Sequence, residues 1–350
     1  MWMPTGWNVE GGHQVQLQRT AGALEDLGLS VDRWLGESLP DGQWSVIHGF
    51  GLRPGDVRLA RTRARRVVIS TVYWDRGYRH EPGSLGRWWI GRHRLGLALR
   101  LGATAVRGPE AGAPIFEFLA DRSMALAYEG ADLLLPNSSA EAVAIERDLG
   151  VTTPSAVVPN AVDEELTTLE APPVQQRDRV ICLGRIEPHK NQLALIRALN
   201  SSGLPLHIVG EPHPDHQAYA AACRKEAGPT VRFAGAVHHD SPEFHELLTG
   251  ARVSVLASWF ETTGLANLEA AATGANVVTT DRGYANEYFD GEAWYCNPAS
   301  PGSIRQAVMA AWRHPGYPGL RDRIRREFTW TACAKATLAA YETALAKPGS

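Results

Sequence analysis

Short runs of β-branched and apolar residues alternate with longer stretches of helical periodicity along most of the chain. In the first half, two stretches with helical spacing, 12–27 and 139–149, end at Gly28 and Gly150, and glycine is the usual residue of a left-handed helix cap. The runs that predict strands in this half are 31–35, 45–50, 67–72, 132–136 and 156–158. Strands that alternate with helices predict a parallel sheet covered on both faces.

The same alternation restarts after a break at 169–179, where two prolines precede a run of polar residues. This composition is typical of an interdomain linker. Beyond it, the predicted strands are 180–183, 206–209, 231–233, 252–256 and 276–279. The predicted helices are 191–200, 217–227, 242–249, 264–273, 301–313 and 330–346. We therefore expect an α/β protein of two doubly wound domains that face each other across a cleft, with ligands at the carboxyl ends of the strands.

Length and composition are those of a globular protein with two domains. The chain of 350 residues is too long for one core, and its 44% hydrophobic and 21% charged residues exclude a disordered, collagen-like or coiled-coil chain. The four cysteines stand far apart, which argues against a disulfide framework or a zinc knuckle and favours a reducing compartment. The sequence shows neither a secretory signal nor an apolar run of membrane-spanning length, so we expect a cytoplasmic protein.

Charge is distributed unevenly along the chain. The net charge of −3 argues against a general affinity for nucleic acid, yet residues 53–107 hold thirteen arginines against three acidic residues. This surplus predicts a positive face for an anionic partner or a membrane surface. Within it, 85–100 interleaves arginines with aromatic and apolar residues, a pattern typical of a membrane-interface segment. An ordinary half-buried surface helix is the alternative interpretation.

The segment 259–274 carries the strongest candidate chemistry. Glu261 lies on the loop after a buried strand, and a helix is expected to begin at Gly264, with one of the two preceding threonines as its N-cap. The backbone N–H groups of Gly264 and Leu265 at this helix start favour an anion. Glu269 projects from the same helix, and two carboxylates near an anion site suit a ligand that also carries hydroxyl groups. The alternative is a solvated acidic loop with an ordinary helical glutamate.

Two cationic residues, Arg185 and Lys190, lie on the loop between the predicted strand 180–183 and the helix 191–200. Two cations at the carboxyl edge of a sheet can neutralise a diphosphate, and arginine can bind it bidentately. Taken alone, solvated basic residues on a loop are the simpler interpretation. This loop and the start of the helix at Gly264 lie at the same edge of one sheet. The two cations therefore point more strongly to an anion site.

A third segment, Glu10-Gly11-Gly12-His13, opens the first predicted helix. Gly11 and Gly12 remove side-chain bulk where a backbone can approach a ligand, and the helix start adds N–H donors. A glycine pair is a weak motif by itself, so its interpretation depends on its position at the N-terminus of a helix.

These segments resemble the GT-B-fold glycosyltransferases of family 4, which are retaining enzymes. The motifs that carry the likeness are Arg185 with Lys190, the Glu261-x7-Glu269 spacing, Val-Pro-Asn-Ala-Val-Asp at 158–163 and the glycine pair at 11–12. The resemblance covers essentially the whole chain and is most specific from 157 to 297.

The resemblance implies a particular domain organisation. A Rossmann-like acceptor-binding domain would span 1–168, and a Rossmann-like nucleotide-sugar-binding domain would span 180–330. The linker at 169–179 would join them. The last helix, 331–350, would cross back to brace the first domain.

The resemblance also implies a role for each of four residues in the C-terminal half. Glu269 would bind the ribose of the donor nucleotide, and Glu261 would contact the transferred sugar. Arg185 and Lys190 would hold the donor diphosphate. Base contacts in this family are largely made by the backbone, here expected near 231–237. The donor is expected to be a nucleoside diphosphate sugar and the acceptor a saccharide or a lipid-linked molecule, with neither a metal nor a cofactor.

The N-terminal half matches the family less well. The resemblance implies that Gly11 and Gly12 close over the donor. Many family members carry a histidine at the end of a first-domain strand, whereas this chain has Tyr73-Trp74 there, and Asp75 is the candidate substitute. Two rival functions stay open. This departure favours one of them, a nucleotide-sugar-binding subunit without turnover. The other is a nucleotide-sugar epimerase of the same fold, and the Glu261-x7-Glu269 spacing with the Arg185/Lys190 pair argues against it.

Several histidines invite a functional interpretation but favour a simpler one. The candidate metal ligands are His213, His216, His238, His239 and Asp240. They lie on predicted loops without a cysteine, and zinc usually needs a tighter constellation, so we favour polar loop residues. His48 follows an apolar strand and is expected to be a hydrogen-bonded residue at a strand end rather than a ligand-binding one.

Overall fold

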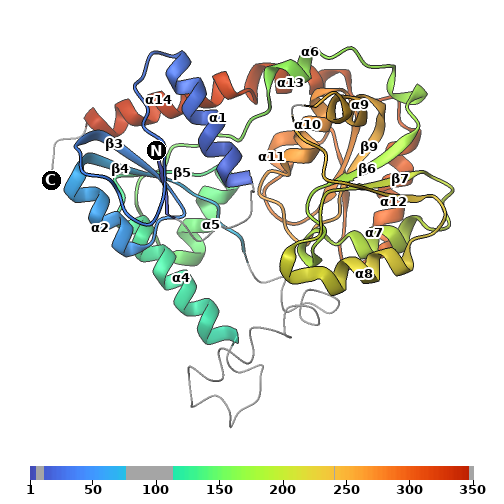
Figure 1. Ribbon diagram of the computed structural model, residues 1–350, viewed down its shortest axis with the longest axis horizontal. Helices are drawn as coiled ribbons and strands as arrows, with labels where there is room; N and C mark the ends of the chain where they lie inside the picture. The colour runs from blue at the N-terminus through green and yellow to red at the C-terminus, as the bar shows by residue number, and fades with distance from the viewer. Residues whose placement is uncertain (5–11, 76–112, 240, 347–350) are drawn as a thin grey trace, which may run out of the picture. The chain divides into compact units, whose positions relative to one another are not determined.

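The computed structural model describes residues 1–4, 12–75, 113–239 and 241–346 (Figure 1). The chain separates into two compact units. The first comprises Met1–Tyr73, Arg92–Ala161 and Trp330–Ser350, and the second comprises Trp74–Gly91 and Val162–Thr329. Each unit is built on its own parallel β-sheet.

The described strands of the first unit form one sheet in the order β2-β1-β3-β4-β5. These strands are β1 (Trp2–Met3), β2 (Trp34–Leu35), β3 (Trp44–Phe50), β4 (Ala64–Ser70) and β5 (Leu133–Leu135). Every pair among them is parallel, and the order 2-1-3-4-5 is that of a doubly wound sheet. The predicted strand at 156–158 is instead an extended segment beside β5, where the N–H of Ala156 donates to the carbonyl of Leu134.

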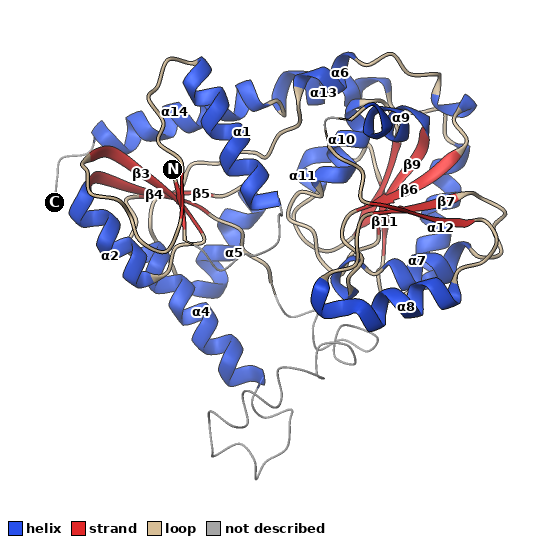
Figure 2. Ribbon diagram, in the orientation of Figure 1, coloured by secondary structure: helices blue, strands red, loops and turns tan. Residues whose placement is uncertain are grey.

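Helices cover both faces of this sheet (Figure 2). They are α1 (Gly12–Asp26), α2 (Pro54–Arg63), α4 (Ala113–Glu129), α5 (Ser139–Leu149) and α14 (Trp330–Ala346). Helices α1 and α14 lie on one face, where apolar residues of α14 share a core with Leu24, Val68 and Leu133. The predicted glycine caps are confirmed, since Gly28 and Gly150 have φ values of 90° and 67°.

His48 ties α14 to the sheet. Its Nδ1 lies 2.7 Å from the hydroxyl of Tyr341 in α14, and its Nε2 lies 2.7 Å from the hydroxyl of Ser70 in β4. The ring is buried, and this burial lowers the pKa of His48 to about 3. The interpretation of His48 as a hydrogen-bonded strand residue is therefore confirmed.

The described strands of the second unit form a parallel sheet in the order β11-β10-β9-β6-β7-β8. They are β6 (Arg179–Leu183), β7 (Leu206–Val209), β8 (Val231–Gly235), β9 (Ala251–Leu256), β10 (Asn276–Thr280) and β11 (Trp294–Cys296). Numbered along the chain within this unit, the order is 3-2-1-4-5-6, the dinucleotide-fold order. In such a sheet the direction of winding reverses between strands 1 and 4, here β6 and β9. Ligands bind outside the carboxyl ends of the strands at this switch point.

Two apolar clusters cover the two faces of this sheet. One holds the side chains of α7 (Gln192–Leu199), α8 (Gln217–Glu226) and α12 (Pro301–Arg313). The other holds those of α6 (Glu164–Thr168), α9 (Pro242–Gly250), α10 (Leu265–Ala272), α11 (Asn286–Phe289) and α13 (Pro318–Glu327). Three 3₁₀ turns complete the described elements: η3 (Val174–Gln176), η4 (Pro188–Lys190) and η5 (Pro214–His216).

The segment 169–179, predicted as a linker, lies inside the second unit. The side chain of Arg177 holds it there by donating to the carbonyls of Pro172, Ala251 and Thr273. Val174 is buried as well. Beyond residue 113, the chain instead passes between the units at Ala161/Val162 and at Thr329/Trp330, so composition alone misplaced this boundary.

Candidate functional site

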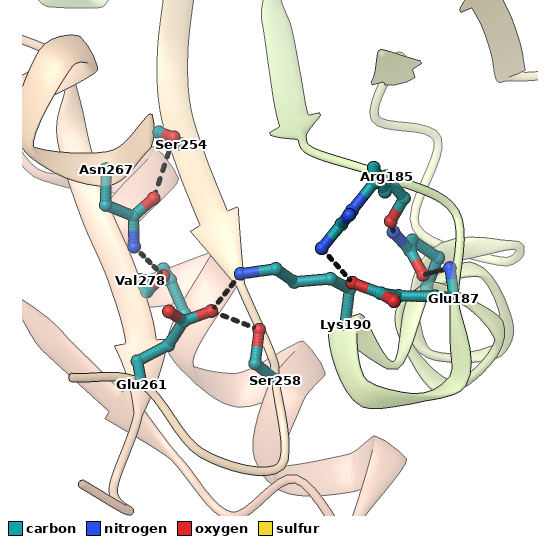
Figure 3. Close-up of polar contacts among 9 residues, drawn as sticks. Arg185, Glu187, Lys190, Ser254, Ser258, Glu261, Asn267 and Val278 are labelled. Carbon is teal, nitrogen blue, oxygen red and sulfur yellow. Dashed lines mark hydrogen bonds and ion pairs between the residues drawn. The ribbon is translucent and has the colours of Figure 1, made fainter. Parts of the chain in front are cut away.

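The switch point of the second sheet carries a buried ion pair between the loops that follow β6 and β9. The ammonium Nζ of Lys190 lies 2.7 Å from Oε1 of Glu261, and the hydroxyl of Ser258 donates to the same oxygen at 2.6 Å (Figure 3). Lys190 ends the turn η4 after β6, and Glu261 follows β9. The sequence placed both residues at one sheet edge, and the structure brings them into direct contact.

The ion pair sets the charge of both side chains. Burial disfavours the charged forms, but the attraction of Glu261 outweighs it and raises the pKa of Lys190. In the same way, burial raises the pKa of Glu261, but Lys190 together with the hydrogen bonds more than compensates, so the net pKa is lowered. The site therefore holds a carboxylate and an ammonium at neutral pH, with 22% of the Lys190 side chain exposed.

Asn191 fixes the loop that presents Lys190. It adopts a left-handed conformation, with φ of 58°, between η4 and α7. Its side-chain amide donates to the carbonyls of Ala257 and Pro298 at 3.0 and 2.9 Å. Because these carbonyls follow β9 and β11, the loop after β6 is anchored to its neighbours at the edge where the ion pair lies.

Arg185 lies on the same loop but is less constrained than Lys190. Its guanidinium is 3.6 Å from the carboxylate of Glu187, and 38% of its side chain is exposed (Figure 3). Its backbone carbonyl accepts a hydrogen bond of 2.7 Å from the Gln192 amide. Each of the two predicted cations is thus paired with a carboxylate in this structure.

Gly283 holds the backbone of Glu261, and sequence reasoning missed it. The N–H of Glu261 donates to the carbonyl of Arg282, and the N–H of Tyr284 donates to the carbonyl of Glu261. Gly283 between them has φ of 101°, and a Cβ there would lie 2.0 Å from the Glu261 carbonyl oxygen. Only glycine fits this approach. The one available signal was its place just after the strand β10.

Helix α10 begins as predicted, but with a different cap. Gly264 itself is the N-cap, with φ of 73°, rather than either preceding threonine. Its carbonyl accepts from the N–H groups of Asn267 and Leu268. Oε2 of Glu261 lies 3.9 Å from where a Cβ on Gly264 would stand, so the carboxylate is close to the positive end of this helix. Leu265 is the first residue of α10 and therefore lies at the same helix N-terminus.

Glu269 lies one turn further along α10, and its contact is with His239 rather than with Lys190. Its Oε1 is 2.7 Å from Nε2 of His239, and Nδ1 of His239 is 3.7 Å from the carboxylate of Asp163. Only 12% of the Glu269 side chain is exposed. From the sequence, His239 was a candidate only as a metal ligand, and no motif indicated its contact with Glu269.

The candidates from residues 11–75 are less completely described. Gly12 is exposed at the start of α1, whereas Gly11 lies outside the described residues. Tyr73 is buried, and its hydroxyl donates to Asp148 at 3.1 Å. Trp74 and Asp75 belong to the second unit. There the ring of Trp74 stacks on that of His189, with centroids 4.6 Å apart, and Asp75 is exposed.

The arginine-rich segment 53–107 falls mostly outside the described residues, including all of 85–100. Three of its described arginines contact their own unit. Arg61 donates to the carbonyl of Gly130, Arg63 pairs with Asp41, and Arg66 donates to the carbonyl of Ala344. These arginines therefore brace the fold of the first unit as well as adding positive charge.

Neither a metal-binding cluster nor a membrane-spanning helix is present among the residues that the structure describes. In the ranges that the structure describes, no group of three or more histidine, cysteine or acidic side chains could hold a metal ion. His213 and His216 lie near each other there, with ring centroids 5.0 Å apart, and Asp240 is not among the described residues. Nor does that part of the chain contain a helix long and apolar enough to cross a membrane.

Residues 177–314 match the family model described as "Glycosyl transferases group 1", and this range contains the ion pair and all of α10. Glycogen synthase of Mycobacterium tuberculosis is 30% identical over 174 residues, which are 46% of this chain and 42% of that protein. The chain thus spans less than half the length of the curated relatives it matches.

Similar solved structures extend over nearly the whole chain. The Anabaena protein HepE, solved with UDP and glucose, has a TM-score of 0.65 and 14% identity, and the match covers 97% of this chain and 98% of that one. Sucrose-phosphate synthase from Thermosynechococcus elongatus has a TM-score of 0.62 and 17% identity, with 85% and 73% covered. At these identities the likeness shows the fold, and together with the two parallel sheets it identifies a GT-B fold.

Proposed function

We propose that this chain is a glycosyltransferase that moves a sugar from a nucleotide-sugar donor to a saccharide or lipid-linked acceptor, with retention of configuration. The observation that carries the proposal is the Lys190–Glu261 ion pair at the switch point between β6 and β9, inside the matched range 177–314. Lys190, which can exchange its carboxylate partner for a ligand anion, lies there with Glu261 and the N-terminus of α10.

The cations provide the main catalytic effect in this proposal. When the nucleoside diphosphate leaves, negative charge develops on its phosphate oxygens. Lys190 and Arg185 can stabilise this charge by exchanging their present partners, Glu261 and Glu187, for phosphate. Preorganised groups of this kind contribute roughly 3–4 kcal/mol each to transition-state stabilisation. The N-terminus of α10 at Gly264 adds N–H dipoles to the same region.

The carboxylates hold the sugars of the donor. Glu261, once released by Lys190, can accept hydrogen bonds from hydroxyls of the transferred sugar while Ser258 keeps it oriented. Glu269 is assigned to the ribose, because a carboxylate can accept from both hydroxyls of a vicinal diol. The binding of UDP and glucose by the Anabaena neighbour supports a donor of this class.

Retention follows from a front-face reaction in which the departing phosphate itself takes the acceptor proton. No protein general base is then required, and neither a metal nor a cofactor is part of the proposal. Gly11 and Gly12 of the first unit and Asp75 of the second are assigned to donor binding. Peripheral membrane contact through 53–107 on the cytoplasmic side stays a prediction.

A second candidate is a nucleotide-sugar-binding subunit without turnover. The observation that favours it is the environment of Tyr73, which stands where many members of the resembled family carry a histidine. Its N–H donates to Glu141 and its hydroxyl to Asp148, so this side chain is committed to the fold of the first unit.

Calorimetry with UDP, ADP and GDP, followed by assay of the corresponding nucleotide sugars, tests both candidates. A transferase releases the nucleoside diphosphate slowly from its donor without acceptor, whereas a binding subunit releases none. Glu269→Ala should weaken nucleotide binding by about tenfold or more, because a charged hydrogen bond contributes about 1.5–3 kcal/mol. Glu246→Ala, an exposed glutamate on α9, is the matched control. Unchanged affinity in Glu269→Ala would remove the ribose assignment.

A further inference from the structure

Three segments of the second unit meet at Glu269. Asp163 lies before α6, His239 lies on the loop after β8, and Glu269 lies on α10. The His239 ring bridges them, with its Nε2 2.7 Å from Glu269 and its Nδ1 3.7 Å from Asp163. A half-buried carboxylate, an imidazole and a second carboxylate thus lie next to one another at the proposed ribose site.

The chemistry of these groups fixes the direction of the short hydrogen bond. A carboxylate oxygen accepts hydrogen bonds, so in the tautomer that makes this contact Nε2 of His239 carries the hydrogen and donates the hydrogen bond to Oε1 of Glu269. The other oxygen of Glu269 is then the one that can accept a ligand hydroxyl. Because the outer torsion of a glutamate is broad, a fixed donor is needed to hold the carboxylate in one orientation.

The imidazole is itself held on two sides. Its ring packs against the buried ring of Phe244, with centroids 4.5 Å apart and planes inclined by 31°. Asp163 faces its other nitrogen. Proteins commonly preorganise a binding carboxylate or imidazole in this way. A second side chain orients the binding group, and a third side chain orients the second.

We propose that His239 is a positioning residue that fixes Glu269 to read the ribose diol, and that it determines preference for ribonucleotides over deoxyribonucleotides. Asp163, 3.7 Å from Nδ1, attracts the ring when both of its nitrogens carry a hydrogen, which gives a role to the last residue of the Val158–Asp163 motif. This inference rests on the proposed function, because it takes Glu269 as the ribose ligand.

The test compares ribonucleotides with their deoxy counterparts on the full chain. Calorimetry measures the affinity for UDP, ADP and GDP, for the 2′-deoxy and 3′-deoxy form of whichever binds most tightly, and for inorganic pyrophosphate. The wild type should prefer the ribonucleotide by about tenfold or more, since a lost hydrogen bond to a charged group has an effect of this size. His239→Ala should bring this ratio close to one and leave pyrophosphate affinity unchanged.

Two further variants sharpen the test. His239→Gln retains a side-chain N–H donor and should restore part of the ribose preference. His238→Ala alters the exposed neighbour on the same loop and should keep the wild-type ratio. A merely structural role of His239 would shift all ligands together.

The outcomes separate this inference from the function on which it rests. If Glu269→Ala abolishes the ribose preference but His239→Ala keeps it, the positioning role is wrong and the ribose assignment stands. If Glu269→Ala also keeps the preference, the ribose assignment itself fails. A parallel loss of pyrophosphate affinity in His239→Ala would overturn the inference too, because the effect would not be confined to the ribose.

Discussion

Each unit buries a glutamate near the carboxyl ends of its strands, and the two carboxyls have opposite character. Glu261 in the second unit has its pKa lowered, since the Lys190 ion pair and hydrogen bonds outweigh its burial. Burial instead raises the pKa of Glu141 in the first unit to about 7, although its hydrogen bonds pull it partly back. The identity of the partner, rather than the depth of burial, therefore decides the charge.

The partners of Glu141 are neutral. Oε1 accepts from the Thr71 hydroxyl at 2.9 Å and from the N–H of Tyr73 at 2.7 Å, and Oε2 accepts from the N–H of Asn137 at 2.8 Å. Asn137 in turn accepts from Gln16 of α1 at 3.1 Å. This network ties the segments that follow β4 and β5 to α1 and α5. Glu141 thus acts within the fold, whereas the cation paired with Glu261 can be exchanged for a ligand anion.

Removing the cation from the second unit should have the largest effect. Lys190→Met leaves Glu261 buried without its partner, which makes its environment resemble that of Glu141. We expect turnover to fall by about a hundred- to a thousandfold. The free energy of unfolding should fall by as much as about 3 kcal/mol, the lower end for breaking a buried pair, since Lys190 is partly exposed.

Urea unfolding and turnover assays measure both changes. The double variant Lys190→Met/Glu261→Gln serves as the control, because it removes the unpaired charge. It should recover much of the lost stability but none of the turnover. Wild-type turnover in Lys190→Met would show that the ion pair is structural, like the Glu141 network.

Disturbing the backbone of Glu261 without changing any charge should have an intermediate effect. Gly283→Ala places a Cβ 2.0 Å from a carbonyl oxygen at a φ of 101°, so the Glu261 segment must move. A displacement of about 1 Å can lower turnover by about a hundredfold. Gly291→Ala is the matched control, because Gly291 has φ of 80° and nothing within 4 Å of the added Cβ.

Thermal unfolding and turnover distinguish the two glycine variants. Gly291→Ala should lose only about 1–2 kcal/mol, from the left-handed conformation, and keep its turnover. Equal stability and equal turnover in both would mean that the close approach of Gly283 does not position Glu261.

The carboxyl of the first unit should affect turnover least, and its effect on stability depends on pH. Between about pH 4.5 and 7, Glu141 ionises in the unfolded chain but stays protonated in the folded one. The unfolded state then binds fewer protons, so stability from this group falls as pH rises, by about 1.4 kcal/mol per pH unit. The stability advantage of the wild type over Glu141→Gln should shrink across this window.

Urea unfolding of both proteins at pH 5, 6 and 7 measures this difference. Comparing the two proteins also cancels His48, whose lowered pKa of about 3 makes stability rise with pH between about 3 and 6.5. A constant difference across the window would show that Glu141 is ionised in the folded chain. Nucleotide affinity of the second unit should be the same in both proteins.

Much of the fold follows from local pattern. The helix at 139–149 ends at Gly150, and the strand at 206–209 has the bounds predicted from its apolar run. Helix α13 was missed because most of its ten residues are polar or charged, and only Leu320 and Ile324 are buried apolar side chains. The polar run at 169–179 resembled a linker, since nothing in its composition shows that Arg177 binds three distant carbonyls.

The sequence by itself determined the two parallel α/β sheets and placed Arg185, Lys190 and Glu261 at one edge, because residues just after parallel strands must gather there. The tertiary structure alone decided which charges touch: Lys190 with Glu261, and His239 with Glu269. It also decided that Gly283 leaves room for the Glu261 carbonyl. These contacts join residues 22 to 71 positions apart. Local periodicity carries no information about partners at that separation.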